Sequence, residues 1–289
     1  MAIEKSTYFP GIVAQQMFSA VQGHSALAKI AQSRPIPFNG TDIIAFASSD
    51  EAAIVAEGAA KPAFDGENGV IQVRPIKFVF GQRVSDEFRY AADEVRLQYL
   101  QGFADAFSKK IARGFDIAAM TGKDPQSATA VTSLATNNFH DVVTNVITST
   151  SGSEDAAVQA AVTALMGAGY QADGIVITPA MASALAAITA AGVPQFPELA
   201  WGGNPERVKG LRSDITTALA FDSSTDLALV GDFENAFVWG YAKDIPLEVI
   251  EYGDPDGAGD LKRYNQVYLR AEAYIAWAIL DKDAFGIVE

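Results

Sequence analysis

Short runs of β-branched and aromatic residues between positions 38 and 80 predict strands. The runs cover 43–46, 69–73 and 76–80, and an acidic segment of small residues at 50–69 lies between the first two. An isolated two-stranded hairpin is only marginally stable in water. Because this hairpin has little apolar mass of its own, we expect it to rest on other protein, either the body of the chain or a neighbouring copy.

The strongest helical pattern begins after the last of these runs. Ser85 is suited to cap a helix, and Asp86 and Glu87 suit the positive end of its dipole. Apolar residues then recur at intervals of three and four, on one helical face: Leu100, Phe103, Phe107, Ile111, Phe115 and Ala118. We predict a helix from 86 to about 120, capped by Gly122 and roughly 50 Å long. A compact domain of this size does not require so long a helix.

Residues 153–192 have the pattern of a helix, a strand and a second helix. Ser153 caps the first helix, 174–178 is a short buried strand, and Pro179 begins a helix that ends at 190 or 191. Loops are predicted at 125–152 and 193–213. Further strands are predicted at 227–230, 236–239, 247–252 and 266–280.

The first 37 residues differ in composition from the segments that follow. They contain one acidic residue, Glu4, and prolines and a glycine punctuate them at 10–11 and 34–37. Several apolar residues between these points could line a short helix: Ile12, Val13, Met17, Phe18, Val21 and Leu27. We interpret the segment as an arm that docks on a protein surface, with a frayed terminus as the alternative.

The composition is that of a folded, acidic protein. The 289 residues include 21 Lys and Arg against 35 Asp and Glu, a formal net charge of −14. This balance disfavours a general nucleic-acid binder, because counterion release needs clustered cations, and it favours repulsion between copies. The chain has no cysteine, which excludes disulfides and thiolate chemistry. It also has no signal-peptide pattern and no apolar stretch of about 18 residues, so we expect a soluble, intracellular protein.

No motif in the sequence indicates catalysis. The two histidines, His24 and His140, have no metal-ligand spacing, and we interpret both as surface or packing residues. Residues 122–124 resemble the end of a phosphate-binding loop, but an Asp occupies the place of the Ser or Thr. The glycines at 167–169 follow a helix rather than a strand, unlike a dinucleotide-binding motif. We therefore predict no catalytic, cofactor-binding or metal-binding residues.

The acidic segment at 254–260 has two interpretations. Its three aspartates and two glycines could surround a calcium ion, but Ala258 stands at a ligand position and no bidentate Glu follows. We favour a turn between two antiparallel strands. Two further carboxylate pairs are interpreted as solvated surface: Glu248 with Glu251, and Asp281 with Asp283.

The order of short motifs along the chain resembles a known family. The motifs are EGAAKP at 57–62, VSDE at 84–87, DIAAMTG at 116–122, TP at 178–179, LVGDF at 229–233, LRAE at 269–272 and DAF at 283–285. Each motif is short, and specificity comes from their order and spacing. Together they resemble the major capsid proteins of tailed double-stranded DNA bacteriophages, which have the Hong Kong 97 fold. The resemblance covers about 35–285.

The resemblance implies an α+β, Hong Kong 97-like capsid fold with four parts. Residues 1–37 would be the N-terminal arm, and 38–80 the extended β-hairpin loop that reaches over a neighbouring subunit. Residues 81–130 and 241–289 would form the peripheral domain with its long spine helix. Residues 131–240 would form the axial α/β domain near the five- and six-fold positions.

The resemblance also implies a structural role without catalysis. Such a protein self-assembles through pentamers and hexamers into an icosahedral shell, is built in the bacterial host cytoplasm, and encloses DNA without sequence-specific binding. No long, charged helical segment precedes the arm, so we expect a separate scaffolding protein or none. The family also implies a portal partner and allows a decoration protein, with no cofactor and no membrane.

Three alternatives stay open beside this interpretation. Some relatives crosslink a loop lysine to a neighbour's asparagine; Lys61 lies in the loop, but no Asn is identifiable as its partner, so we do not expect a crosslink. An encapsulin-type nanocompartment shell would use the same fold. A doubly wound enzyme or small-molecule binding protein could be built around 153–192, but it leaves the long helix and the hairpin unexplained.

Overall fold

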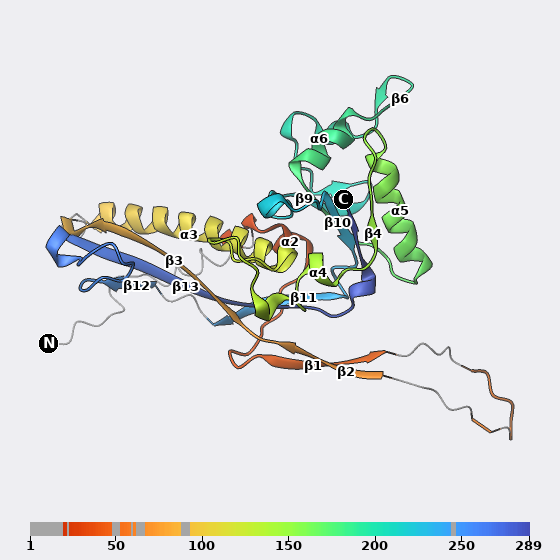
Figure 1. The fold of residues 1–289 in the computed structure, drawn as a ribbon, viewed down its shortest axis with the longest axis horizontal. Helices are drawn as coiled ribbons and strands as arrows, with labels where there is room; N and C mark the ends of the chain where they lie inside the picture. Colours follow the sequence, from red (N-terminus) through yellow and green to blue (C-terminus); the bar gives the residue numbers. More distant parts are fainter. Residues whose placement is uncertain are drawn as a thin grey trace.

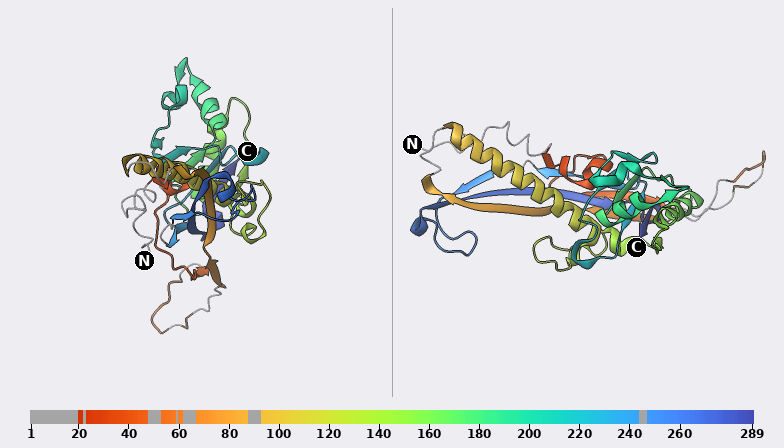
Figure 2. Two further views of the ribbon diagram at one scale, coloured as in Figure 1. Left: turned by 90° about the vertical axis from the view of Figure 1, so that its left-hand side faces the viewer. Right: turned by 90° about the horizontal axis from the view of Figure 1, so that it is seen from above.

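The molecule is elongated, as its computed structural model shows. A long helix and long strands form one end, a second unit of helices and strands forms the other, and a hairpin projects away from both (Figures 1 and 2). Much of the predicted arm, including Ile12, Val13, Met17 and Phe18, lies outside the described residues. The structure describes residues 20–21, 23–47, 53–58, 60–61, 67–87, 93–243 and 247–289.

The long strand β13 (Gln266–Ile279) organises the first sheet. It pairs antiparallel with β3 (Ile76–Ser85) along one edge, and with β12 (Leu247–Ile250) and β11 (Phe237–Lys243) along the other. Successive strand residues point to opposite faces, so its two faces pack against different parts of the chain. The strands predicted at 236–239, 247–252 and 266–280 are confirmed, and the run predicted at 76–80 continues to Ser85.

The long helix α3 (Asp93–Thr121) covers one face of this sheet. All six apolar positions of the predicted helical face are buried, and Phe115 packs against Trp277 of β13 with ring centroids 5.3 Å apart. The predicted end is confirmed, because Gly122 has φ +68° and its N–H bonds to the carbonyl of Ala118.

The predicted start of the helix is wrong. Ser85 is the last residue of β3, where it pairs with Gln266, and Asp86 and Glu87 form a 3₁₀ turn. The Ser85 hydroxyl still accepts a bond from the Glu87 amide, so it caps this turn instead of α3. Residues 88–92 lie outside the described part of the chain, and α3 is described from Asp93 onward.

The second unit is built on a six-stranded mixed sheet. Its helices are α5 (Glu154–Gly167), which contacts β10 and β14, and α6 (Pro179–Ala187), which is capped by Thr178. The predicted first helix and the strand at 174–178 are confirmed. In spatial order the strands are β4 (Val146–Ile147), β14 (Phe285–Val288), β10 (Ala228–Gly231), β5 (Gly174–Ile177), β9 (Leu211–Ile215) and β8 (Arg207–Val208).

Two predictions in this unit need correction. The helix α6 ends at Ala187 rather than at 190 or 191, because the chain turns into a small hairpin of β6 (Thr189–Ala190) and β7 (Val193–Pro194). The strand β14 pairs antiparallel with β10. Residues 285–288 therefore pair within this sheet, although the resemblance assigns them to the peripheral domain with 241–289.

Short elements complete the connections, and several of them lie in the segments predicted as loops, 125–152 and 193–213, which corrects that prediction. The helix α4 (Phe139–Val142) is capped by the Asn138 side chain and lies against α3. Within the described ranges, no helix is both long enough and apolar enough to cross a bilayer. The 3₁₀ helices are Thr132–Leu134, Pro197–Gly202, Phe221–Ser223, Lys262–Tyr264 and Lys282–Ala284.

The helix α2 (Ala26–Ile30) joins the two units. The buried carboxylate of Asp116 in α3 accepts bonds from the Ser25 hydroxyl at 2.6 Å and from the Ala26 amide at 2.8 Å. On the other side, Lys29 Nζ donates to Asp214 of β9 at 2.9 Å. The described part of the predicted arm thus docks on the chain's own body.

Candidate assembly surfaces

The hairpin of β1 (Thr41–Ala47) and β2 (Glu67–Val73) confirms the first two predicted strands. The strands pair antiparallel, with Ile43 opposite Ile71 and Ile44 opposite Val70. The first pair packs toward a small apolar cluster at the base of the hairpin, where Val73 is buried. The second pair points away, with Ile44 61% and Val70 59% exposed. The outward face therefore presents an apolar pair to its surroundings.

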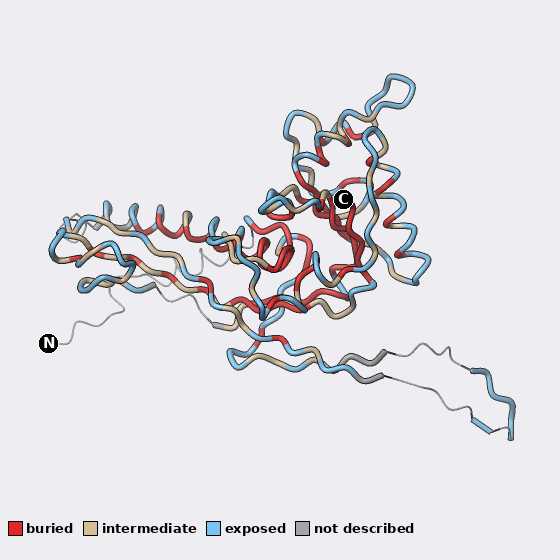
Figure 3. Tube along the Cα trace, in the orientation of Figure 1, coloured by how far each residue is buried: buried red, intermediate tan, exposed pale blue. Residues whose placement is uncertain are grey.

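The described residues beyond the paired strands are exposed (Figure 3). Ile54 is fully exposed and Val55 is exposed as well. Glu57 and Gly58 form a turn in which Gly58 has φ +79°, a conformation that glycine adopts without a steric cost. Exposing a large apolar side chain costs roughly 1.5–3 kcal/mol relative to burying it. The distal hairpin therefore has the character of a surface that another protein covers.

Lys61 is the hairpin residue considered for a covalent crosslink. It is exposed at the far end of the hairpin. The expectation that it forms no such bond stays a prediction.

A second exposed surface lies at the far end of the first sheet, in the loop between β12 and β13. The Arg83 Nε atom donates to both carboxylate oxygens of Asp256, at 2.8 and 3.0 Å, and Arg83 Nη2 donates to Asp254 at 3.1 Å. The carbonyl of Gly259 accepts a further bond at 2.8 Å. The hydrogen bonds from Arg83 lower the pKa of Asp256 to about 2. This loop joins two antiparallel strands, as predicted, and an arginine neutralises its carboxylates.

Aromatic residues flank the Arg83-bound loop. Tyr252 and Tyr264 are exposed, with the Lys262 ammonium 5.1 Å from the Tyr252 ring centroid and the Arg263 guanidinium 5.8 Å from that of Tyr264. Exposed tyrosines beside cations are common at contacts between proteins. The loop is thus a second candidate contact surface.

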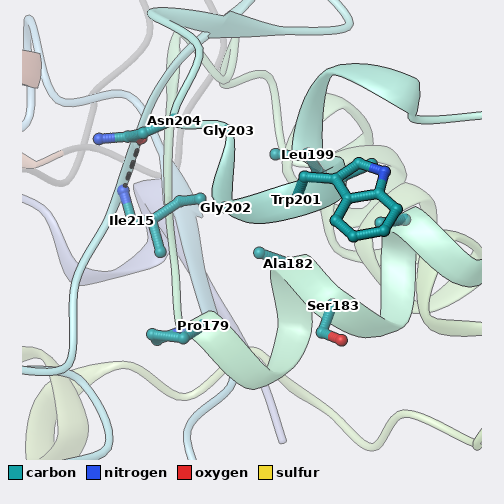
Figure 4. A pocket seen from close by; sticks show the side chains of 11 residues that line it. Pro179, Ala182, Ser183, Leu199, Trp201, Gly202, Gly203, Asn204 and Ile215 are labelled. Atoms are coloured by element: carbon teal, nitrogen blue, oxygen red, sulfur yellow. Dashed lines mark hydrogen bonds between the residues drawn. The ribbon is translucent and has the colours of Figure 1, made fainter.

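A third surface is a hollow of about 530 Å³ beside α6 (Figure 4). Trp201 stands fully exposed at its edge, in a left-handed conformation with φ +59°. Its lining contains no Asp, Glu, Lys, Arg or His, so it cannot supply a proton donor or acceptor of useful pKa. The lining residues are Pro179, Ala182, Ser183, Ala186, Leu199, Ala200, Trp201, Gly202, Gly203, Asn204 and Ile215.

The residues weighed for chemistry have structural partners. His140 Nδ1 lies 2.9 Å from a carboxylate oxygen of Asp226. Burial raises the pKa of the Asp226 carboxyl. His24 is exposed. Lys123 binds Asp222 at 2.8 Å, and Asp124 accepts the Gln126 amide in a turn. In the described parts of the chain, no three His, Asp or Glu side chains gather as metal ligands would.

Comparison with known proteins finds one matching family and several solved structures of similar fold. Residues 10–289 match the model of the phage capsid family. No curated protein matches the chain. Its fold is similar to that of a solved chain from Mycobacterium phage Ogopogo, with 28% identity, a TM-score of 0.77, and coverage of 92% of this chain and 91% of that one.

Two further solved structures share the fold. A chain from Gordonia phage Cozz is 24% identical, with a TM-score of 0.71 and coverage of 91% of this chain and 85% of its own. A capsid chain of an empty GTA particle is 18% identical, with a TM-score of 0.65 and coverage of 92% and 89%.

Proposed function

This chain belongs to the phage capsid family and is a major capsid protein of the virion, and from that premise we propose that its β1–β2 hairpin holds neighbouring copies together in the shell. The observation that carries the proposal is the outward apolar pair Ile44 and Val70, together with the exposed Ile54. Each is at least 59% exposed, and burial of a fully exposed side chain of this kind contributes roughly 1.5–3 kcal/mol. Many such modest contacts, repeated around a closed shell, suffice for a stable particle.

We assign the four parts of the subunit on the same basis. Residues 1–37 are the arm, 38–80 the extended loop, 81–130 with 241–289 the peripheral domain, and 131–240 the axial domain. The pairing of β14 with β10 supports adding 285–288 to the axial sheet. The length of α3 supports its role as the spine of the peripheral domain.

The role that we propose is structural, with no catalytic step. The shell encloses double-stranded DNA without reading its sequence, and portal, scaffolding and decoration proteins are candidate partners of the assembled particle. The residues weighed for catalysis, phosphate binding and calcium binding support this assignment, because His140, Lys123 and Asp256 are each engaged by a structural partner.

Adjacent residues on opposite faces of β1 provide a matched test of the hairpin's role. Ile44→Thr removes apolar surface from the outward face and keeps a β-branched side chain suited to a strand. We expect the variant to fold with a melting temperature near that of the wild type, but to form fewer shells in negative-stain images and gel filtration. Ile43→Thr alters the inward face and should instead lower the melting temperature of the unassembled subunit.

The proposal fails if Ile44→Thr and Val70→Thr together leave the yield and stability of shells unchanged. Ile44→Val is the conservative control and should assemble like the wild type.

A further inference from the structure

Three cationic side chains lie within five residues on the solvent-exposed face of α3, called the cationic face below. Lys109, Lys110 and Arg113 are exposed, whereas Phe107 and Ile111 between and beside them are buried. A helix advances about 100° per residue, so positions 109, 110 and 113 fall on one side of it. In a chain of net charge −14, this is a local reversal of sign.

The two lysines of this cationic face have no acidic partner within the described ranges. Asp105, one turn earlier and exposed, does not form the ion pair with Lys109 that its spacing allows. The Arg113 guanidinium lies 5.7 Å from the Phe221 ring centroid. By contrast, Lys77 of β3 binds Glu272 at 2.7 Å. The charges of the cationic face are therefore available to an external anion.

The cationic face and the hairpin lie on opposite sides of the first sheet. Trp277 of β13 packs in the cluster that contains Phe115 of α3, whereas its neighbours Ala276 and Ala278 pack in the cluster at the base of the hairpin. Figure 1 shows α3 on one side of the first sheet and β1 and β2 beyond the other. In a curved shell, one of these sides faces the inside and the other the outside.

We propose that the cationic face of α3 lines the inside of the shell and contacts the phosphates of the enclosed duplex DNA. This inference rests on the proposed function, and charge complementarity selects the ligand, because duplex DNA is the concentrated polyanion of such a particle. Lysine and arginine bind phosphates without reading bases. Three cations on each copy give weak contacts that are repeated over the inner surface, while the acidic remainder of the subunit limits adhesion.

Thiol labelling tests the direction of this face, because the natural chain has no cysteine. Single variants Lys110→Cys and Asn39→Cys place a thiol on the cationic face and at the exposed turn before β1. Dissociated subunits of both variants should react with a maleimide carried on a protein too large to enter the particle. In intact shells Asn39→Cys should react and Lys110→Cys should be protected. If Lys110→Cys is labelled in intact shells to the same extent as in dissociated subunits, the inference is overturned.

Binding of a mixed-sequence 30-base-pair duplex to unassembled subunits at low salt tests the ligand. The triple variant Lys109→Gln, Lys110→Gln, Arg113→Gln should make the negative slope of log affinity against log salt shallower by up to about 3, since each neutralised phosphate contributes about 0.9 to its magnitude. The matched control, Arg207→Gln, Lys209→Gln, Lys282→Gln, removes the same charge at exposed positions elsewhere and should keep the wild-type slope.

Two other outcomes separate the possible failures. Unchanged duplex binding with lost shell formation in the triple variant would assign the cations to a contact between copies, and would overturn the inference. If the wild-type chain forms no particles, rings or sheets at all, the proposed function fails.

Discussion

A single buried side chain, Asp116 of α3, fixes the start of α2 on the body of the subunit. Its carboxylate is buried near the C-terminal end of α3 and accepts three bonds from the start of α2: from Ser25 Oγ, Ala26 N and Leu27 N. Burial raises the pKa of Asp116 to about 7, with a smaller contribution from the charge of Asp214. The residue therefore links the docking of α2 to pH near neutrality.

The sign of this linkage predicts a pH dependence of stability. Between pH 4 and 7 the folded subunit keeps a proton on Asp116 that the unfolded chain has released. The free energy of unfolding should therefore fall as pH rises through this range, by up to about 1.4 kcal/mol per pH unit, and level off above pH 7. Asp116→Asn cannot ionise and should lack this dependence. Urea denaturation of unassembled subunits at pH 5 and pH 8 measures both proteins, and a pH-independent difference between them would contradict the prediction.

At the scale of elements, features set by local residue spacing could be predicted from the sequence, whereas features set by pairing between strands distant in sequence could not. The apolar face of α3 and its end at Gly122 follow from local spacing and were predicted. Its start was not, because Ser85 is held in β3 by pairing with Gln266, which no local pattern encodes. The strand β14 was missed because its buried residues form a continuous apolar run without a period.

The candidate surfaces were predictable to different degrees. The need of the hairpin for external support followed from its low apolar content, whereas the exposed pair Ile44 and Val70 depends on the pairing register. The burial of Asp116 could not be predicted, because it lies about 100° around the helix from Phe115 and is covered by the start of α2. The lack of an acidic partner for Lys109 and Lys110 could not be predicted, since Asp105 is correctly spaced for an ion pair and does not form one.

The loop between β12 and β13 provides a prediction at the same scale. Arg83→Gln removes the guanidinium that binds Asp254 and Asp256, so the pKa of Asp256 should rise from about 2 toward its ordinary value. Amide hydrogen exchange in 253–260 should become faster at the same time. Arg83→Lys keeps the charge but not the forked geometry and should give an intermediate result. Carboxyl titration by NMR and hydrogen exchange of the unassembled subunit measure these effects, and an unchanged pKa of Asp256 would contradict the assignment.

At the scale of the whole molecule, net charge opposes the contacts that build a shell. Each copy carries a formal charge of −14, so approaching copies repel one another. The Debye length falls from about 30 Å at 0.01 M salt to about 10 Å at 0.1 M. Repulsion over the width of a contact is thus largely screened at the higher concentration.

Shell formation should therefore be faster and more complete at 0.1 M than at 0.01 M monovalent salt. Light scattering of purified subunits at equal protein concentration follows the rate, and negative-stain images confirm that the product is a shell. An assembly rate that falls as salt increases would show that attraction between opposite charges dominates the contacts.

The pairing of β3 with β13 also determines when the first sheet can form during synthesis of the chain. Ile76 pairs with Ile275 and Ser85 with Gln266, so the platform beneath the hairpin forms only when residues far downstream have left the ribosome. Such non-local pairing slows folding. Because an isolated two-stranded hairpin is only marginally stable, the β1–β2 hairpin gains its full support only in the completed chain, and unfinished chains lack a firmly held assembly surface.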